Sequence, residues 1–385
     1  MADGGSSSGG AGGVTASSGG HATTSGGQAA AGTGGLPHHI GSCDALAPAG
    51  TWEEITPSEV SLDADFKTPA GDNFGDHSFV IDPQDTAHVY LGTSAQGIYE
   101  SKDCGATWKK INTGRNGDKL DSGRQWTFVI DPDDPQVLYT NAGYGQNNAW
   151  KSTNGGVDWD ELIDPAYAAA LQFGGFVHMI SMDPTDHQHL IVTPHFECEI
   201  GKGPGGLPLT KQCLLETTDA GATWTIKEGT PTSGEGGGEW MVDSKLWFWS
   251  EWFGGLWRTE NAGATWEHVW DQGYASSSGF AAPGGDLFVG GVFGVLHSDD
   301  TKTWSSLAGA PGVDVLSGDA TILFGARGAS YWSTTPDEPQ KWTTLPSPPF
   351  ADPNTTLDWG IKWDSDHRLL YSINSRAGFW RMAVE

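Results

Sequence analysis

The chain has 385 residues, enough to bury a large core, and its 20 basic and 48 acidic side chains give a formal net charge of −28. This charge repels nucleic acid and anionic membranes, so we expect neither as a partner. No apolar run is long enough to span a bilayer, and we therefore expect no transmembrane segment.

The first 42 residues consist almost entirely of Gly, Ser, Ala and Thr. Such a segment cannot bury enough apolar surface to order itself, which predicts a disordered tether over 1–42 and one folded domain over 43–385. Gly/Ser tethers are typical of exported bacterial lipoproteins. We therefore expect a secreted or cell-surface protein, although the chain begins without a visible signal peptide. His21, His38 and His39 lie in or near the tether, where a solvated linker explains them better than a metal site.

One skeleton, Ser/Thr-x-Asp/Asn-x-Gly-x-Thr/Asp-Trp, recurs along the rest of the chain. Each copy stands between two short apolar runs, which is a hairpin pattern. The Asp or Asn side chain can accept hydrogen bonds from its own turn, the glycine permits positive φ, and the tryptophan buries a large ring. Good copies occupy 101–108, 152–159, 217–224 and 259–266, with a shortened copy at 298–304 and a degenerate one at 333–342.

The repeat resembles the Asp-box (BNR) motif of sialidases, xyloglucan-cleaving hydrolases and sortilin-type receptors, over about residues 50–385. The resemblance implies an all-β propeller in which the Asp boxes lie on the face opposite the ligand site. It does not by itself specify an activity.

Short strands with regular turn signals fit this architecture. The first three blades open with inner strands that end in Asp-Pro, and weaker copies follow at 239–266, 280–304 and 313–342. Three strands remain at 357–364, 369–373 and 379–382, while 50–55 looks like an exit strand that has lost its turn. We therefore predict a seven-bladed Asp-box propeller closed by an N-terminal strand in the last blade. Six blades are the alternative.

The four cysteines indicate an oxidising compartment. Cys198 and Cys213 bracket a loop and are predicted to pair. Cys43 and Cys104 would form the second disulfide, with two unpaired thiols as an equal alternative. We expect the protein to be a monomer.

Strand alternation places the repeated turns on one face, and the loops that enter the inner strands or join second to third strands on the other. Ligand sites are usually built from such loops. The predicted catalytic residues are Asp76, His77, His178, Glu197, Glu239, Glu251 and Asp358. The predicted substrate-binding residues are Arg124, Trp126, Tyr144, Gln146, His195, Trp240, Trp252, Arg327, Trp359 and Arg376.

Trp rings stack on sugars, and glycosidic hydrolysis requires two carboxyl groups. The favoured function is therefore a glycoside hydrolase acting on an extracellular polysaccharide, with a merely hydrated channel mouth as the alternative for this polar set. A polysaccharide lyase would use a His or Tyr base, with Arg124 neutralising a uronic acid. A non-catalytic, sortilin-like binding propeller is the third reading. Sialidase is disfavoured because the chain has seven arginines and no Arg-Ile-Pro.

The xyloglucan-cleaving enzymes carry two tandem propellers where this chain has one, and their early-blade signatures are not evident. Their catalytic aspartates are therefore not carried over. His195 and Glu197 supply only two potential metal ligands. We expect no cofactor, while a structural calcium or zinc ion stays open.

Overall fold

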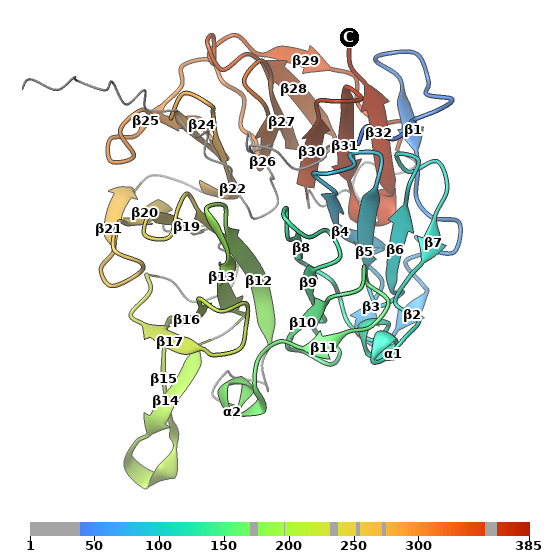
Figure 1. The fold of residues 1–385 in the computed structure, drawn as a ribbon. Coiled ribbons are helices and arrows are strands. Elements are labelled where there is room, and N and C mark those ends of the chain that lie inside the picture. Colours follow the sequence, from blue (N-terminus) through green and yellow to red (C-terminus); the bar gives the residue numbers. More distant parts are fainter. Residues whose placement is uncertain are drawn as a thin grey trace, which may run out of the picture.

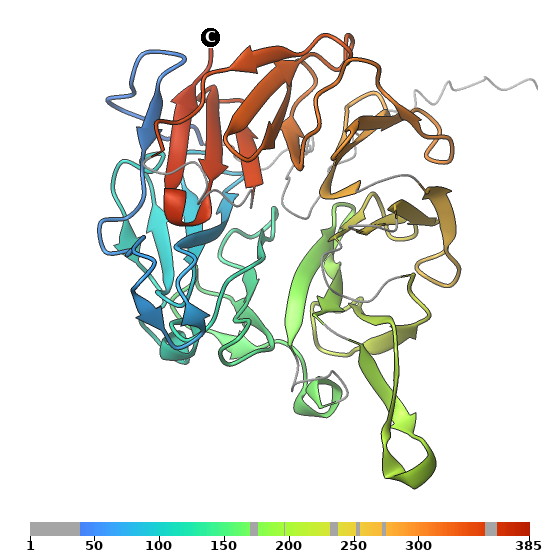
Figure 2. The ribbon, with the colours of Figure 1, turned by 180° about the vertical axis from the view of Figure 1, so that it is seen from behind.

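The computed structural model describes residues 39–169, 176–195, 197–231, 238–251, 255–271, 275–350 and 360–385. Within them, seven four-stranded antiparallel sheets stand around a common centre as the blades of a propeller (Figures 1 and 2). The predicted seven-bladed, all-β fold is confirmed, and the six-bladed alternative is wrong. Most of the predicted tether lies outside the described residues.

Each blade runs from an inner strand near the axis to an outer strand at the rim. Blade 1 contains β4 (Asp76–Ile81), β5 (Val89–Thr93), β6 (Ile98–Ser101) and β7 (Lys109–Lys110); blade 2 contains β8 (Phe128–Ile130), β9 (Leu138–Asn141), β10 (Ala149–Ser152) and β11 (Asp160–Glu161). Blade 3 contains β12 (Val177–Asp183), β13 (Asp186–Pro194), β16 (Cys213–Thr217) and β17 (Thr225–Glu228); blade 4 contains β18 (Gly238–Met241), β19 (Trp247–Glu251), β20 (Gly255–Thr259) and β21 (Glu267–Trp270). Blade 5 contains β22 (Ala275–Ala281), β23 (Leu287–Gly291), β24 (Gly294–Ser298) and β25 (Ser305–Ser306); blade 6 contains β26 (Val315–Gly318), β27 (Leu323–Arg327), β28 (Ser330–Thr334) and β29 (Thr343–Leu345). Blade 7 contains β30 (Gly360–Asp364), β31 (Leu369–Ile373), β32 (Phe379–Ala383) and β1 (Trp52–Glu54).

In the described part of the chain, two hairpins and four short helices are added to the blades. They are β2 (Lys67–Thr68) with β3 (Gly71–Asp72), β14 (Cys198–Lys202) with β15 (Pro208–Lys211), α1 (Gly117–Leu120), α2 (Pro165–Ala168), η1 (Pro204–Gly206) and η3 (Ser375–Ala377). The β14–β15 hairpin leaves the ring at the bottom of Figure 1. No helix within the described ranges has the length and apolarity needed to cross a membrane.

The last blade is completed from the other end of the chain. Strand β1 pairs with β32 so that Trp52 lies opposite Met382 and Glu54 opposite Trp380. The Trp52 indole donates a hydrogen bond to the Pro346 carbonyl, 2.7 Å away, which ties the strand to blade 6. The pairing covers the edge of β32 and closes the ring, as the sequence predicted.

The repeated motif forms the predicted hairpin turn between third and fourth strands. In the first copy, the Asp103 carboxylate accepts hydrogen bonds from the Thr107 amide (2.8 Å) and hydroxyl (2.6 Å). The Ser101 hydroxyl accepts one from the Gly105 amide at 2.7 Å, and Gly105 has φ of 92°. Asp219 and Thr223 repeat the same amide contact at 2.8 Å. The serine and aspartate of the turn therefore bond to the turn's own amides and hydroxyl.

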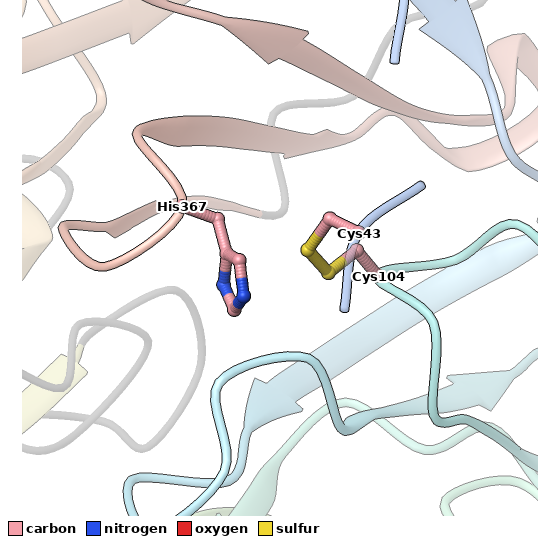
Figure 3. Close-up of side chains that lie close together, drawn as sticks. All are labelled: Cys43, Cys104 and His367. Atoms are coloured by element: carbon pink, nitrogen blue, oxygen red, sulfur yellow. A yellow bond between two sulfur atoms is a disulfide. The ribbon is translucent and has the colours of Figure 1, made fainter. Parts of the chain in front are cut away.

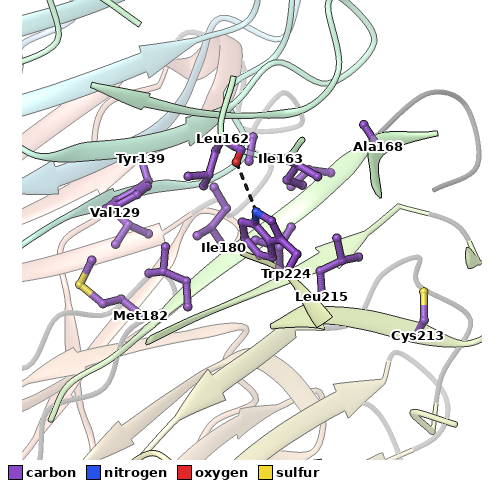
Figure 4. Close-up of a cluster of buried hydrophobic side chains, with 14 of the residues drawn as sticks. Val129, Tyr139, Leu162, Ile163, Ala168, Ile180, Met182, Cys213, Leu215 and Trp224 are labelled. Carbon is purple, nitrogen blue, oxygen red and sulfur yellow. Dashed lines mark hydrogen bonds between the residues drawn. The ribbon is translucent and has the colours of Figure 1, made fainter. Parts of the chain in front are cut away.

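Neighbouring blades are joined by apolar side chains and inner-strand hydroxyls. Figure 4 shows the cluster between blades 2 and 3, where Trp224 is 4% exposed and its indole donates to the Leu162 carbonyl at 3.3 Å. Burying an aromatic side chain of this kind stabilises the fold by roughly 2–3 kcal/mol. The Ser78 hydroxyl donates to the Gln125 carbonyl at 2.6 Å, and the Ser181 hydroxyl donates to the Glu239 carbonyl at 2.9 Å.

Both predicted disulfides are present. Cys198–Cys213 closes the base of the β14–β15 hairpin, and Cys43–Cys104 attaches the N-terminal segment to the first turn motif (Figure 3). The alternative of free thiols at Cys43 and Cys104 is therefore wrong. Two disulfides are compatible with an oxidising compartment.

Candidate functional site

The strand registers place the repeated turns and the predicted site residues at opposite ends of the blades. In blade 1, Asp76 lies opposite Thr93 at one end of the sheet, while Val89 lies opposite both Ile81 and Ser101 at the other. The turn motif begins at Ser101. We call the end that carries the starts of the inner strands, together with the second-to-third-strand loops, the entry face.

Three consecutive blades place an aromatic or imidazole ring at the same entry-face position. His77, Trp126 and His178 each stand five positions before the aspartate of the Asp-Pro turn that ends their inner strand. The pairing register shifts by a bulge between Asp76 and Ser78 and again between Val177 and Met179. A bulge bends the strand and re-aims its side chains, so both histidines leave the regular alternation of their sheets.

Trp126 lies at the centre of the resulting group, which we call the entry-face cluster. Its ring stacks on His195 (5.3 Å between centroids) and on Phe176 (5.5 Å). His178 and Tyr144 approach it edge-on at 5.2 and 5.4 Å, and His77 lies 6.4 Å away. The cluster consists of Phe74, His77, Arg124, Trp126, Tyr144, Phe176, His178 and His195.

Arg124 lies between two aromatic rings of this cluster. Its guanidinium carbon is 4.1 Å from the centroid of Phe74 and 4.7 Å from that of Tyr144. Nη2 donates to the carbonyls of Ala70 and Asp72, at 3.2 and 3.3 Å, in the β2–β3 hairpin. Cation–π contact and these bonds fix the charge at the entry face.

The backbone of the turn that carries Tyr144 allows neighbouring aromatic rings to pack closely against it. Tyr144 adopts a left-handed conformation, with φ of 59°, although its side chain is 48% exposed. A bulky residue in this region is strained, and such strain concentrates at functional sites. A Cβ on the preceding Gly143 would lie 3.0 Å from the rings of both Phe176 and Trp126, so glycine lets these rings approach the backbone. Gln146 lies in the same turn and is exposed.

Two imidazoles of the cluster, those of His77 and His178, are held neutral. Burial, together with the positive charge of Arg124, lowers the pKa of His77 to about 3. Burial, followed by the neighbouring His195, also lowers the pKa of His178 well below its usual value. Neutral imidazole can both donate and accept hydrogen bonds. A group with such a low pKa is a weak general base at neutral pH, because efficient bases titrate near the working pH.

Two predicted catalytic carboxyls have the opposite perturbation. Asp76 is fully buried, and burial raises its pKa to about 7, partly offset by a hydrogen bond from Thr56 and reinforced by Glu54. Its Oδ2 accepts from the Thr56 hydroxyl at 3.2 Å. Glu239 is also fully buried in β18, and burial raises its pKa to about 8 against the lowering effect of Thr193. Carboxyls that stay protonated near neutral pH are suited to donate a proton.

The other predicted residues are scattered. Trp240 is fully buried and stacks on Phe248 at 4.4 Å, so its ring belongs to the core between blades 4 and 5. Glu197 accepts a bond from Gln212 at 2.8 Å beside the β14–β15 hairpin. Arg327 donates to the Val292 carbonyl at 3.0 Å in blades 5 and 6. Glu251 ends β19, Arg376 lies in η3, and Trp252, Asp358 and Trp359 lie outside the described residues.

Sequence reasoning missed three residues that the structure brings into view. Phe74 and Phe176 complete the cluster, and both stand in the loops that enter inner strands, which was the available signal. Lys362 is 6% exposed within β30, and burial lowers its pKa to about 8. A lysine between Ile361 and Trp363, in the middle of an apolar inner strand, was visible in the sequence but was not weighed.

Within the described ranges, two groups have the ligand types of a metal site. Cys43, Cys104 and His367 form one (Figure 3), but the disulfide leaves no thiolate to bind a metal. In the other, Nδ1 of His187 lies 3.0 Å from Asp131 and 3.1 Å from Asp133, and a hydrogen bond to Asp131 is the main cause that raises its pKa. Ion pairs between a protonated His187 and the two aspartates explain this second group without a metal ion. The expected absence of a cofactor stays a prediction.

No protein-family model matches the chain. A xyloglucanase from Paenibacillus sp. is 28% identical over 181 residues, which cover 41% of this chain and 17% of that protein. The xyloglucanase Xgh74A of Acetivibrio thermocellus is 25% identical over 201 residues, which cover 47% of this chain and 23% of that enzyme. The chain therefore spans less than a quarter of the length of these curated relatives.

Among solved structures, YCF48 from Cyanidioschyzon merolae superposes with a TM-score of 0.57 at 12% identity, covering 86% of this chain and 98% of that one. The extracellular domain of the putative two-component system BT3049 from B. thetaiotaomicron gives a TM-score of 0.55 at 12% identity, covering 80% of this chain and 40% of that one. At these identities the likeness establishes the propeller fold alone.

Proposed function

We propose that this propeller is an extracellular carbohydrate-active protein that binds a polysaccharide across its entry face and hydrolyses it. The observation that carries the proposal is the entry-face cluster, an assembly of aromatic rings and neutral imidazoles contributed by three adjacent blades. Aromatic rings pack against the apolar faces of sugar rings, and neutral imidazoles can bond to hydroxyls as donor or acceptor. The similarity to two xyloglucanases supports the same class of ligand.

Hydrolysis of a glycosidic bond requires one carboxyl group that is protonated at the working pH and a second that is ionised or activates water. Asp76 and Glu239 satisfy the first requirement through their raised pKa values of about 7 and 8. Glu251 and Asp358 are proposed as ionised partners. Because Asp76 and Glu239 are fully buried, we propose that substrate binding opens the local packing around the acid that is used.

The test is a screen of plant and microbial polysaccharides for new reducing ends. Asp76→Asn and Glu239→Gln each remove a proton donor while keeping the side-chain size, and at least one is expected to lower turnover by 100-fold or more, as is typical of a lost general acid (roughly 10²–10⁴). Glu228→Gln is the matched control, because Glu228 lies on the outer strand β17 and pairs with Lys211 at 3.2 Å. Full activity in both acid variants would exclude this choice of catalytic residues.

A polysaccharide lyase is the second candidate, favoured by the presence of Arg124 in a cluster that also contains three imidazoles. The lowered pKa values of His77 and His178 make them weak bases, so this candidate ranks below hydrolysis. A lyase would release unsaturated sugars with ultraviolet absorbance, whereas a hydrolase would not. Binding without turnover of any glycan would leave the non-catalytic reading.

The proposal also covers the location of the protein, the nature of its repeated turn and its oligomeric state. Two disulfides and the Gly/Ser-rich segment support export, with lipid anchoring as the finer expectation. We propose that the turn motif is an Asp box and that the protein is a monomer. Labelling of intact cells with an antibody tests the first point, and light scattering of the purified protein tests the last.

A further inference from the structure

Arg124 makes no ion pair with a carboxylate of the described residues, and burial lowers its pKa more than the charges of Tyr144 and Asp72 raise it. Of the arginines in the described part of the chain, Arg115, Arg258, Arg327 and Arg381 each form an ion pair with Asp or Glu, at 3.8 Å or less. Arg124, like Arg376, forms none with a described carboxylate within 4.0 Å, but only Arg124 lies in the entry-face cluster. Its Nε is buried and has no hydrogen-bond partner. In a chain with a net charge of −28, an uncompensated guanidinium is unexpected, because partly buried arginines are normally paired.

The side chain is nevertheless held in a defined place. Its guanidinium lies between the rings of Phe74 and Tyr144, and only Nη2 is used in hydrogen bonds to the protein, to the Ala70 and Asp72 carbonyls. A guanidinium has five donor hydrogens. Within the described residues, the hydrogens on Nε and Nη1 therefore have no protein acceptor.

The surroundings of Arg124 favour an anion that is attached to a ring. Tyr144 is 48% exposed at its side, and the half-buried ring of Trp126 lies next to Tyr144. His77 is kept neutral and so does not compete for an anion. A carboxylate accepts charge-assisted hydrogen bonds from a guanidinium, which are about twice as strong as neutral ones.

We infer that Arg124 is a carboxylate-binding subsite of the entry face, and that the ligand class is an acidic oligosaccharide bearing uronic acids. This inference rests on the proposed carbohydrate ligand but does not depend on hydrolysis. The sugar ring packs against Tyr144 or Trp126, while its carboxylate bonds to the free hydrogens of Arg124. Because the protein as a whole is acidic, a cation held at the entry face without an acidic contact favours an anion locally.

A purely structural role for Arg124 makes a different prediction. The bonds to Ala70 and Asp72 attach the β2–β3 hairpin to the entry loop of blade 2, and any long donor could retain part of this attachment. Arg124→Lys keeps the charge but loses the planar donor fork. Arg124→Gln loses the charge and keeps a donor.

The experiment measures binding of three oligosaccharides of matched length by calorimetry. The first is an oligogalacturonide, the second its methyl ester, and the third a neutral xyloglucan oligosaccharide. Short oligomers limit repulsion by the net charge. We expect the acid to bind about 10- to 100-fold more tightly than its ester, the range of one charged hydrogen bond. Arg124→Gln should abolish this preference and Arg124→Lys should retain part of it. Arg115→Gln, an exposed arginine paired with Asp160, should change nothing.

Equal affinity for the acid and its ester in the unaltered protein overturns the inference, whatever the variants do. Retained acid selectivity in folded Arg124→Gln also overturns it. If Arg124→Gln does not fold, the ester comparison and Arg124→Lys decide. Release of reducing ends from a neutral glycan, without acid selectivity, would leave the proposed function intact and refute the subsite. Acid-selective binding without cleavage of any glycan would support the Arg124 subsite and refute the proposed hydrolysis.

Discussion

His189 joins two carboxylates in the interior of blade 3, and its replacement tests how charge stabilises this propeller. The side chain is 3% exposed, with Nδ1 3.0 Å from Asp183 and Nε2 3.1 Å from Glu216. Lys227 adds a second cation 2.8 Å from Glu216. Burial opposes protonation of His189, but hydrogen bonds and charge from the two carboxylates outweigh it and raise the pKa to about 9.

The raised pKa determines both the size and the sign of the effect. The pKa of His189 rises from about 6.5 in the unfolded chain to about 9 in the folded protein. This difference corresponds to a contribution of at most about 3 kcal/mol to the free energy of unfolding. The folded state binds the proton more tightly, so this stabilisation is complete below about pH 6.5. It decreases as the pH rises and is lost above about pH 9.

The assay is denaturant unfolding of the unaltered protein and of His189→Gln between pH 6 and pH 10. We expect the difference in unfolding free energy to be largest at pH 6 and to shrink by up to about 3 kcal/mol at pH 10. His297→Gln is the control, because His297 lies on the half-buried outer side of β24, 3.5 Å from Asp286. A difference that stays constant with pH would falsify the assignment of a charged His189.

Three further predictions concern the ring and its buried acid. Trp52→Ala removes the indole that attaches β1 to blade 6 and should lower the free energy of unfolding by about 3–5 kcal/mol; an unchanged denaturation midpoint would contradict strand closure. Replacing Cys43 and Cys104 together by Ala removes a disulfide between residues 61 apart and should lower the free energy of unfolding by up to about 4 kcal/mol. An unchanged free energy of unfolding would show that this disulfide does not form in the purified protein. Asp76 has a folded pKa of about 7 against 3.8, so its ionisation destabilises the fold as the pH rises from about 4 to 7. Asp76→Asn should therefore gain stability relative to the unaltered protein over this range, by up to about 4 kcal/mol; a gain that appears equally at pH 4 would argue against a charged Asp76.

Much of the fold could be predicted because its signals are local and repeated. The turn motif recurs with its strands, and each copy fixes its own hydrogen bonds, as Asp103 and Asp219 illustrate. The exit strand at Trp52 could be recognised because a turn was missing before it. Two cysteines could be paired by their spacing around a hairpin, whereas the Cys43–Cys104 bond joins distant segments and could only be offered as an alternative.

The site was less predictable because neighbouring blades contribute to it jointly. His77, Trp126 and His178 share a position relative to the Asp-Pro turns, and this was present in the sequence. Their contact with Tyr144 and His195 depends on how the blades pack. Trp240, at a similar place in blade 4, enters the core instead.

The sequence by itself therefore indicated the propeller, the closing strand and the face that carries the turns, and the structure decided between seven blades and six. These properties follow from short-range hydrogen bonds and strand alternation, which are written locally in each repeat. Only the tertiary structure decided which rings surround Trp126, that Asp76 and Glu239 lose their water, and that Nε of Arg124 is buried without an ion pair to a described carboxylate. Desolvation and charge balance depend on what is packed around a group from other blades, and a single stretch of chain does not contain that information.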